Sequence, residues 1–184
     1  MKVEAKITRD WIVRMVKFMA IALVCAAWFG YDGLVGYPKQ IERATAYQQL
    51  KNDKELEKWP EVAKEHGWST KDPGEPKTAG DIKEQLVIAS IGLVILFLLI
   101  GWVLVSSRKV LRADENRIIS PFGTEVLMDS VVDLDHRKWE QKGIVYAVYQ
   151  PDGKGKKRLA LDDFKYGGAI EVIRYLENKL GITP

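Results

Sequence analysis

The chain is poor in the residues from which many metal and nucleophilic centres are built. Its 184 residues include one cysteine, Cys25, and two histidines, His66 and His136. A single cysteine excludes a disulfide framework and a cysteine-based metal cluster. A long apolar segment separates the two histidines. If that segment crosses a membrane, no site that uses both can form within one chain.

An excess of charge of one sign is also lacking. The 28 lysines and arginines nearly balance the 25 aspartates and glutamates, so the formal net charge is +3. This value is too small to indicate nucleic acid as a partner. The charges are dense and mixed outside the apolar segments, which is typical of solvated faces.

The chain does contain a long uncharged run, which extends from Gln85 to Ser107. A bilayer core about 30 Å thick requires about 20 apolar residues in a helix. A chain of this length has no soluble core thick enough to hide such a helix. Asp81 and Glu84 form a capping-box pattern before the run, and Arg108 and Lys109 follow it, where cations can snorkel. We predict a membrane-spanning helix over residues 85–107.

A second span is predicted near the N-terminus. The uncharged run 18–31 is short for a membrane helix, and its length also suits the core of a signal peptide. A start at residue 11 makes the segment long enough to cross, with Arg14 and Lys17 able to reach the interface. The leader contains acidic residues, and no A-x-A cleavage site follows the run. We therefore expect a tail over residues 1–10 and an uncleaved helix over 11–31.

The charges that flank the spans predict the orientation. Five cations precede or begin the first span, and three follow the second: Lys2, Lys6, Arg9, Arg14, Lys17, Arg108, Lys109 and Arg112. The connecting loop, residues 32–84, holds nine lysines and arginines, but most lie far from a membrane end, where they matter less. We expect a multi-pass protein of the inner (plasma) membrane with both termini in the cytoplasm.

The extracytoplasmic loop reads as helical over residues 38–67, with a break at Asn52–Asp53, and 69–80 is a polar connector. Two short helices have too little chain for an independent core. We expect either a partly ordered spacer or a helical hairpin that binds a partner. In the second case Tyr47, Trp59 and Trp68 supply the contact, because exposed aromatic rings often mark interfaces. The same rings could instead lie at headgroup level.

Small residues repeat at four-residue intervals in the first span, at Ala22, Ala26 and Gly30. Such a face lets membrane helices approach closely. It could pack the two spans of one chain together, or join two chains in a homo-oligomer, or be a coincidence in an alanine-rich run.

Residues 108–184 form the predicted cytoplasmic domain, with the spacing of strands followed by one helix. A strand over 143–150, a Pro-Asp-Gly turn and a strand over 157–161 make a hairpin. After Gly167–Gly168 the apolar spacing becomes helical. The sequence predicts a small α+β domain with an antiparallel sheet and a closing C-terminal helix.

Three segments between Val110 and Leu180 carry this order of elements: "ADENRIISPFGTEVL", "VVDLDHRKWEQKGIVYAVY" and "AIEVIRYLENKL". In these segments the chain resembles the pleckstrin-homology-like (PH-like) domains of bacterial membrane proteins. The segment is short by about one strand for a full seven-stranded sheet. The resemblance implies a binding or scaffolding module and does not imply a phosphoinositide ligand.

Two acidic pairs and one basic loop are candidate sites. Asp133-Leu134-Asp135, beside His136, has the D-x-D form of some metal sites, but a solvated strand face explains it as well. For Asp162–Asp163 we expect a role in a turn or a helix cap rather than in general acid–base catalysis. The cations of the predicted hairpin loop could contact anionic lipid: Lys154, Lys156, Lys157 and Arg158.

Nothing in the sequence indicates a catalytic site, a cofactor or a bound metal. The sequence predicts a non-enzymatic two-span anchor or accessory subunit that binds other membrane proteins through its external hairpin and its PH-like domain. The alternative is a membrane-surface module that contacts anionic lipid through the basic loop.

Overall fold

The segment after Met1 alternates polar and apolar side chains, and the structure places it inside a sheet. A computed structural model describes residues 1–151 and 155–182, and here Lys2–Ile7 is strand β1. It pairs antiparallel with β2 (Leu111–Asp114), with Ala5 opposite Leu111. Val3 and Ala5 point into the core. The expectation of a tail over residues 1–10 is therefore wrong, because β1 belongs to the sheet domain.

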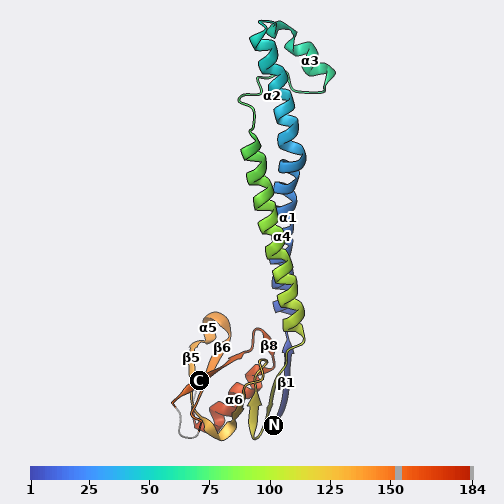
Figure 1. Cartoon of the computed structure of the whole chain (residues 1–184). Coiled ribbons are helices and arrows are strands. Elements are labelled where there is room, and N and C mark those ends of the chain that lie inside the picture. The colour runs from blue at the N-terminus through green and yellow to red at the C-terminus, as the bar shows by residue number, and fades with distance from the viewer. Residues whose placement is uncertain (152–154, 183–184) are drawn as a thin grey trace. The chain divides into compact units, whose positions relative to one another are not determined.

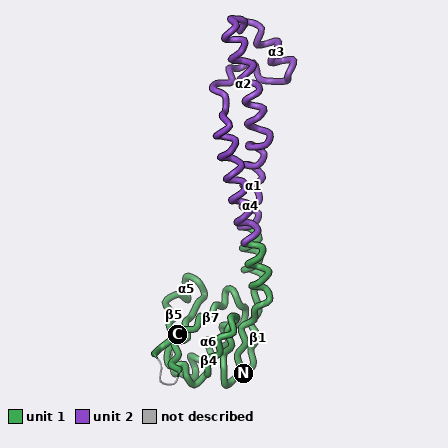
Figure 2. The backbone as a smooth tube through the Cα atoms, viewed as in Figure 1, with its two compact units in different colours: residues 1–17, 99–184 green, residues 18–98 purple. Residues whose placement is uncertain are grey.

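The chain divides into two compact units, residues 1–17 with 99–184 and residues 18–98 (Figure 2). The first unit contains two antiparallel sheets, in the orders β4-β3-β2-β1-β8 and β5-β6-β7 (Figure 1). Their further elements are β3 (Arg117–Ile119), β4 (Glu125–Leu127), η3 (Met128–Ser130), β5 (Val131–Lys138), α5 (Trp139–Lys142), β6 (Ile144–Tyr149), β7 (Lys157–Asp162) and β8 (Tyr166–Gly167).

Helix α6 (Ala169–Leu180) closes the sheet domain, as the change of apolar spacing predicted. Its buried stripe, Val172, Ile173 and Leu176, packs into one core with both sheets. Gly168 precedes the helix at φ +100°, and Gly181 follows it at φ +67°. Both conformations favour glycine, which fixes the two ends of the helix. The antiparallel α+β arrangement is thus confirmed, and β1 adds a strand from outside residues 108–184 to the first sheet.

Two long helices cover the predicted spans. The first runs without interruption through α1 (Arg9–Tyr31), the π-helical segment η1 (Asp32–Gly36) and α2 (Tyr37–Asn52); the second is α4 (Ala79–Ser107). Both are long and apolar enough to cross a membrane. Most of their large apolar side chains are exposed, for example Val24, Phe97 and Leu98. Such surfaces are not those of helices buried in a soluble core.

The second helix begins earlier than expected. The Oγ1 of Thr78 accepts the N–H of Asp81 at 3.2 Å, and the Asp81 carboxylate accepts the N–H of Thr78 at 2.7 Å. This reciprocal pair is a capping box, with Asp81 as its second member rather than its first. The sequence predicted this capping box at Asp81 and Glu84, three residues further along the chain than the structure has it.

Helices η2 (Leu56–Lys58) and α3 (Trp59–Glu65) follow a break after Asn52, where Lys54 adopts a positive φ. The predicted break at Asn52–Asp53 is confirmed, and so is the irregular connector, which extends to Thr78. We call residues 37–78 the head; all of them belong to the second unit.

We predict that β1 is needed for the sheet domain to fold. The register of β1 with β2 would continue to Ile7 opposite Lys109, so a short Gly/Ser linker can join residues 1–8 to residues 108–184. The linked chain should melt cooperatively by circular dichroism, whereas residues 108–184 alone should not, because they lack a central strand.

A matched pair of variants in the linked chain provides the control. Ile173→Asp puts a charge into the core and should unfold the domain, since the penalty of several kcal/mol approaches the whole stability of a small domain. Arg174→Asp, at an exposed position, should not. Equal melting of the two chains with and without β1 would contradict the prediction.

Candidate functional site

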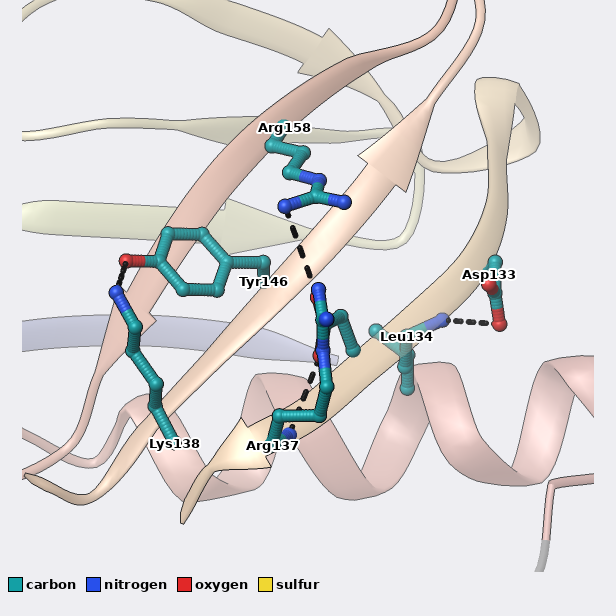
Figure 3. A network of polar contacts seen from close by, with 7 residues as sticks. Asp133, Leu134, Arg137, Lys138, Tyr146 and Arg158 are labelled. Carbon is teal, nitrogen blue, oxygen red and sulfur yellow. Dashed lines mark hydrogen bonds and ion pairs between the residues drawn. The ribbon is translucent and has the colours of Figure 1, made fainter. Parts of the chain in front are cut away.

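The acidic residues of the D-x-D motif form ion pairs and local hydrogen bonds (Figure 3). The Asp135 carboxylate lies 2.6 Å from Nη2 of Arg137 and 3.7 Å from Nη1 of Arg158. The hydrogen bond from Arg137 holds the pKa of Asp135 well below its ordinary value. The Asp133 carboxylate accepts the N–H of Leu134 at 2.8 Å. Asp135 therefore stays ionised between two guanidinium groups, where a metal cation would be repelled.

The other residues near this motif are also engaged in structural contacts. Nε2 of His136 lies 2.8 Å from the Glu177 carboxylate of α6. Nζ of Lys138 donates to the Tyr146 hydroxyl at 3.2 Å (Figure 3). Within residues 1–151 and 155–182, no three Asp, Glu, His or Cys side chains gather in a group that could hold a metal ion.

Asp162 and Asp163 shape the connection between β7 and β8. The Asp162 carboxylate accepts the N–H of Lys165 at 2.8 Å, and the Asp163 carboxylate accepts the N–H of Ile170, in the first turn of α6, at 2.8 Å. Burial raises the pKa of Asp162. These are the turn and capping roles that the sequence predicted for the pair.

The same connection is fastened to the start of α1 by Thr8. The Thr8 hydroxyl donates to the Phe164 carbonyl at 2.6 Å, and the Thr8 N–H donates to the Lys165 carbonyl at 2.9 Å. The hydroxyl oxygen also accepts the N–H of Trp11 at 3.2 Å, as an N-cap residue does. Thr8 thus joins strand β1, helix α1 and the β7–β8 loop at one point.

Lys165 lies against aromatic rings from both long helices. Its Nζ is 4.8 Å from the ring centroid of Trp11, 4.9 Å from that of Trp102 and 5.5 Å from that of Tyr166. The two tryptophan rings meet edge to face, with centroids 5.1 Å apart. These distances are those of cation–π contacts. Burial lowers the pKa of Lys165.

Two more cations lie over aromatic rings at this end of the sheet domain. The Arg14 guanidinium is 4.1 Å from the ring centroid of Phe164. Nζ of Lys109 is 3.9 Å from that of Phe122, which is 74% exposed in the β3–β4 turn. We call this region the junction end. It comprises the start of α1, the end of α4 and the loops that contact them: residues 8–14, 102–109, 120–124 and 162–166.

The basic loop proposed for lipid contact lies at the other end of the sheet domain. Lys154 falls outside the described residues; Lys156 precedes β7, and Lys157 and Arg158 begin it. Lys157 pairs with Tyr149, whereas Asp162, at the other end of β7, adjoins the junction end. Five residue steps in a strand are about 17 Å. The described cations of this loop are therefore far from the point where the helices enter the domain.

The head buries the aromatic residues that were expected to bind a partner. Trp59 is 3% exposed and its indole N–H donates to the Thr70 carbonyl at 2.9 Å. Tyr47 packs edge to face on Trp59, and its hydroxyl donates to Asp72 at 3.2 Å. The premise that the loop cannot bury its own rings is wrong, because the connector after Gly67 folds back over them.

The connector is held in place by Arg43 of α2. Its guanidinium donates to the carbonyls of Ser69 and Lys71, at 3.0 and 2.5 Å. Of the predicted contact residues, only Trp68 keeps substantial accessible surface: it is half-buried, and its ring stacks between Trp59 and the exposed His66. Of the three predicted rings, Trp68, beside His66, is therefore the one that the head presents to solvent.

The small residues of the first span lie where α1 packs on α4. A Cβ on Gly92 would lie 3.1 Å from that of Ala26 and 3.6 Å from the Ala22 carbonyl oxygen, and one on Gly30 would lie 3.9 Å from that of Ala89. The predicted face thus permits close approach of the two helices within one chain, which is one of the two uses that the sequence left open.

We predict that this packing is intramolecular in the membrane. In a Cys25→Ala background, Ala26→Cys with Gly92→Cys should form a disulfide within one chain on oxidation, because the two Cβ positions are close to bonding separation. A shift in mobility on a non-reducing gel reports it. Leu23→Cys with Leu93→Cys, both on exposed faces, is the matched control. Covalent dimers from Ala26→Cys alone would indicate the intermolecular use instead.

Three features were not predicted from the sequence: the hydrogen bonds of Thr8 to the β7–β8 loop, the contact of Lys165 with aromatic rings, and the exposed Phe122. Thr8 carried a usable signal, since a threonine directly before an apolar helix is a common N-cap. The other two depend on contacts between residues far apart in the sequence.

Comparisons of the chain with protein-family models, with curated proteins and with solved structures find no match.

Proposed function

We propose that the protein is a non-enzymatic two-span membrane anchor whose sheet domain is a binding module held at the membrane surface. The observation that carries this proposal is the pairing of β1 with β2. The two apolar helices lie between these strands in the sequence, so the membrane anchor is an insertion into the sheet domain. A module built in this way has no flexible tether between its core and its anchor.

The same pairing supports the proposed topology. Strands that pair must be on one side of the bilayer, and two crossings return the chain to the side from which it started. We place that side in the cytoplasm, and the membrane as the inner membrane, because cations crowd the junction end: Arg9, Arg14, Arg108 and Lys109.

A PH-like fold is proposed for the sheet domain. Strands β1 to β4 follow one another across one sheet, β5 to β7 form the second, and α6 closes the core. The resemblance implies protein binding or scaffolding. The absence of catalysis is part of the proposal, supported by the engagement of Asp135, His136, Asp162 and Asp163 in ion pairs, turns and caps.

We further propose that the partner is a membrane protein and that the head contacts it through Trp68 and His66. Stacked, partly exposed aromatic rings are typical of binding hot spots. Tyr47 and Trp59 are assigned to the core of the head, so their role is to hold this surface in shape.

The topology can be tested with single cysteines at positions 70 and 150 in a Cys25→Ala background. A membrane-impermeant thiol reagent added to intact cells should label position 70 and should label position 150 only after lysis. The reason is that the head and the sheet domain lie on opposite sides of the membrane in this proposal. Labelling of 150 but not of 70 in intact cells would reverse the orientation, and labelling of both would exclude it.

The partner surface can be tested by comparing Trp68→Ala with Trp59→Ala. Trp68→Ala should keep the head resistant to trypsin but lose the co-purifying membrane protein, since truncation of a hot-spot residue costs about 2 kcal/mol or more, roughly thirty-fold in affinity. Trp59→Ala removes a buried ring, a loss of about 3–5 kcal/mol, and should make the head sensitive to trypsin. Retention of the partner by Trp68→Ala, or a wild-type protein that purifies alone in mild detergent, would refute the proposed surface.

A further inference from the structure

We infer that the junction end binds the headgroups of anionic lipids, with Lys165 as the phosphate ligand and Phe122 inserted at the interface. This inference rests on the proposed function, because it assumes that the two long helices cross a bilayer. It assigns the lipid contact to the opposite end of the domain from the basic loop at Lys156 and Lys157.

The two tryptophans of the junction end fix its level relative to the membrane. A helix crosses a bilayer core of about 30 Å in about 20 residues, so a core that begins at Gln85, where the uncharged run of α4 starts, ends near Leu104, within one turn of Trp102. Trp11, in the first turn of α1, contacts Trp102 and so lies at the same level. Tryptophan is enriched at this border between hydrocarbon and headgroups. The Lys165 ammonium, 4.8 and 4.9 Å from the two ring centroids, is therefore at headgroup level.

The Lys165 ammonium has hydrogen-bond donors that a lipid phosphate at headgroup level could use. It carries three N–H groups, and in the described part of the chain no hydrogen-bond acceptor or carboxylate lies within bonding distance of Nζ. Asp162, the carboxylate whose charge acts on Lys165, accepts the Lys165 backbone N–H instead. The rings hold the cation in place without satisfying its donors. Burial lowers the pKa of Lys165, and an anionic phosphate beside it would counter this effect and keep the ammonium charged.

Phe122 provides a second point of contact at the same end. It is the most exposed large apolar residue of the sheet domain, and two hydrogen bonds hold its turn: the Ser120 hydroxyl accepts the N–H groups of Phe122 and Thr124, at 3.2 and 2.9 Å. Lys109, over its ring, is the second residue after α4. An exposed ring flanked by a cation, next to the end of an apolar helix, matches the composition of a membrane interface.

The basic loop is the natural control for this inference. Lys156 and Lys157 are exposed cations of the same domain, but they lie at the far end of β7 from the junction end. General attraction between a basic domain and an anionic leaflet would involve both ends. Specific contact through the junction end would involve Lys165 and Phe122 and leave Lys156 and Lys157 without effect.

The depth of Phe122 can be measured on the full chain in lipid nanodiscs. In a Cys25→Ala background, Phe122→Cys, Leu93→Cys and Lys156→Cys are each labelled with a fluorophore, and quenching by brominated lipid is compared. Labels at 122 and 93 should be quenched and the label at 156 should not. If 93 is quenched but 122 is as exposed to water as 156, the inference fails while the spanning helices stand. If 93 is also exposed to water, the proposed function itself fails.

The headgroup preference is measured by native mass spectrometry of the full chain with phosphatidylglycerol or phosphatidylcholine. The wild type should retain phosphatidylglycerol preferentially, and Lys165→Gln should reduce this preference roughly five-fold, the factor expected for one cation near an anionic surface. Lys165→Arg should keep it, and so should Lys156→Gln. An unchanged preference in Lys165→Gln, or an equal loss in Lys156→Gln, would overturn the assignment. Unaltered melting of the variants shows that the domain remains folded.

Discussion

The antiparallel pairing of β1 with β2 is the constraint on which the rest of the molecule depends. It joins a strand at the N-terminus to one that begins only at Leu111, and everything between them must leave the sheet domain and return to it. Closing so long a loop is unfavourable in entropy, although the penalty grows only slowly with length. Burial of Val3 and Ala5 in the core, together with the ladder of hydrogen bonds, offsets it.

This constraint also explains why the junction end is so densely packed. Both long helices meet the sheet domain there, and Thr8, Trp11 and Trp102 contact the β7–β8 loop from two directions. A single tether would leave the domain free to rotate about it. The start of α1, the end of α4 and the hydrogen bonds of Thr8 to the β7–β8 loop instead hold this end of the sheet domain at several points.

The sequence predicted the features that depend on local composition and periodicity. The uncharged run from Gln85 to Ser107, the break after Asn52 and the amphipathic α6 each carry their signal within a few turns of chain. It did not predict β1, because a short alternating segment becomes a strand only beside a distant partner. It also missed the core around Trp59, which closes only when a Pro/Gly-rich connector folds back over it, a segment that propensity alone describes as irregular.

Side-chain size determines which faces of α1 and α4 pack against each other and which stay exposed. Small residues face one another where α1 meets α4, at Ala26 and Gly92, so the backbones approach closely and dispersion contacts replace lipid. The large apolar side chains, such as Val24 and Phe97, point away from this contact. Because the small-residue face is used within the chain, the proposed membrane partner would have to bind the large-residue faces or the head. In hydrocarbon a face of large side chains gains little by exchanging lipid for protein, and this argument favours the head as the surface that binds the proposed partner.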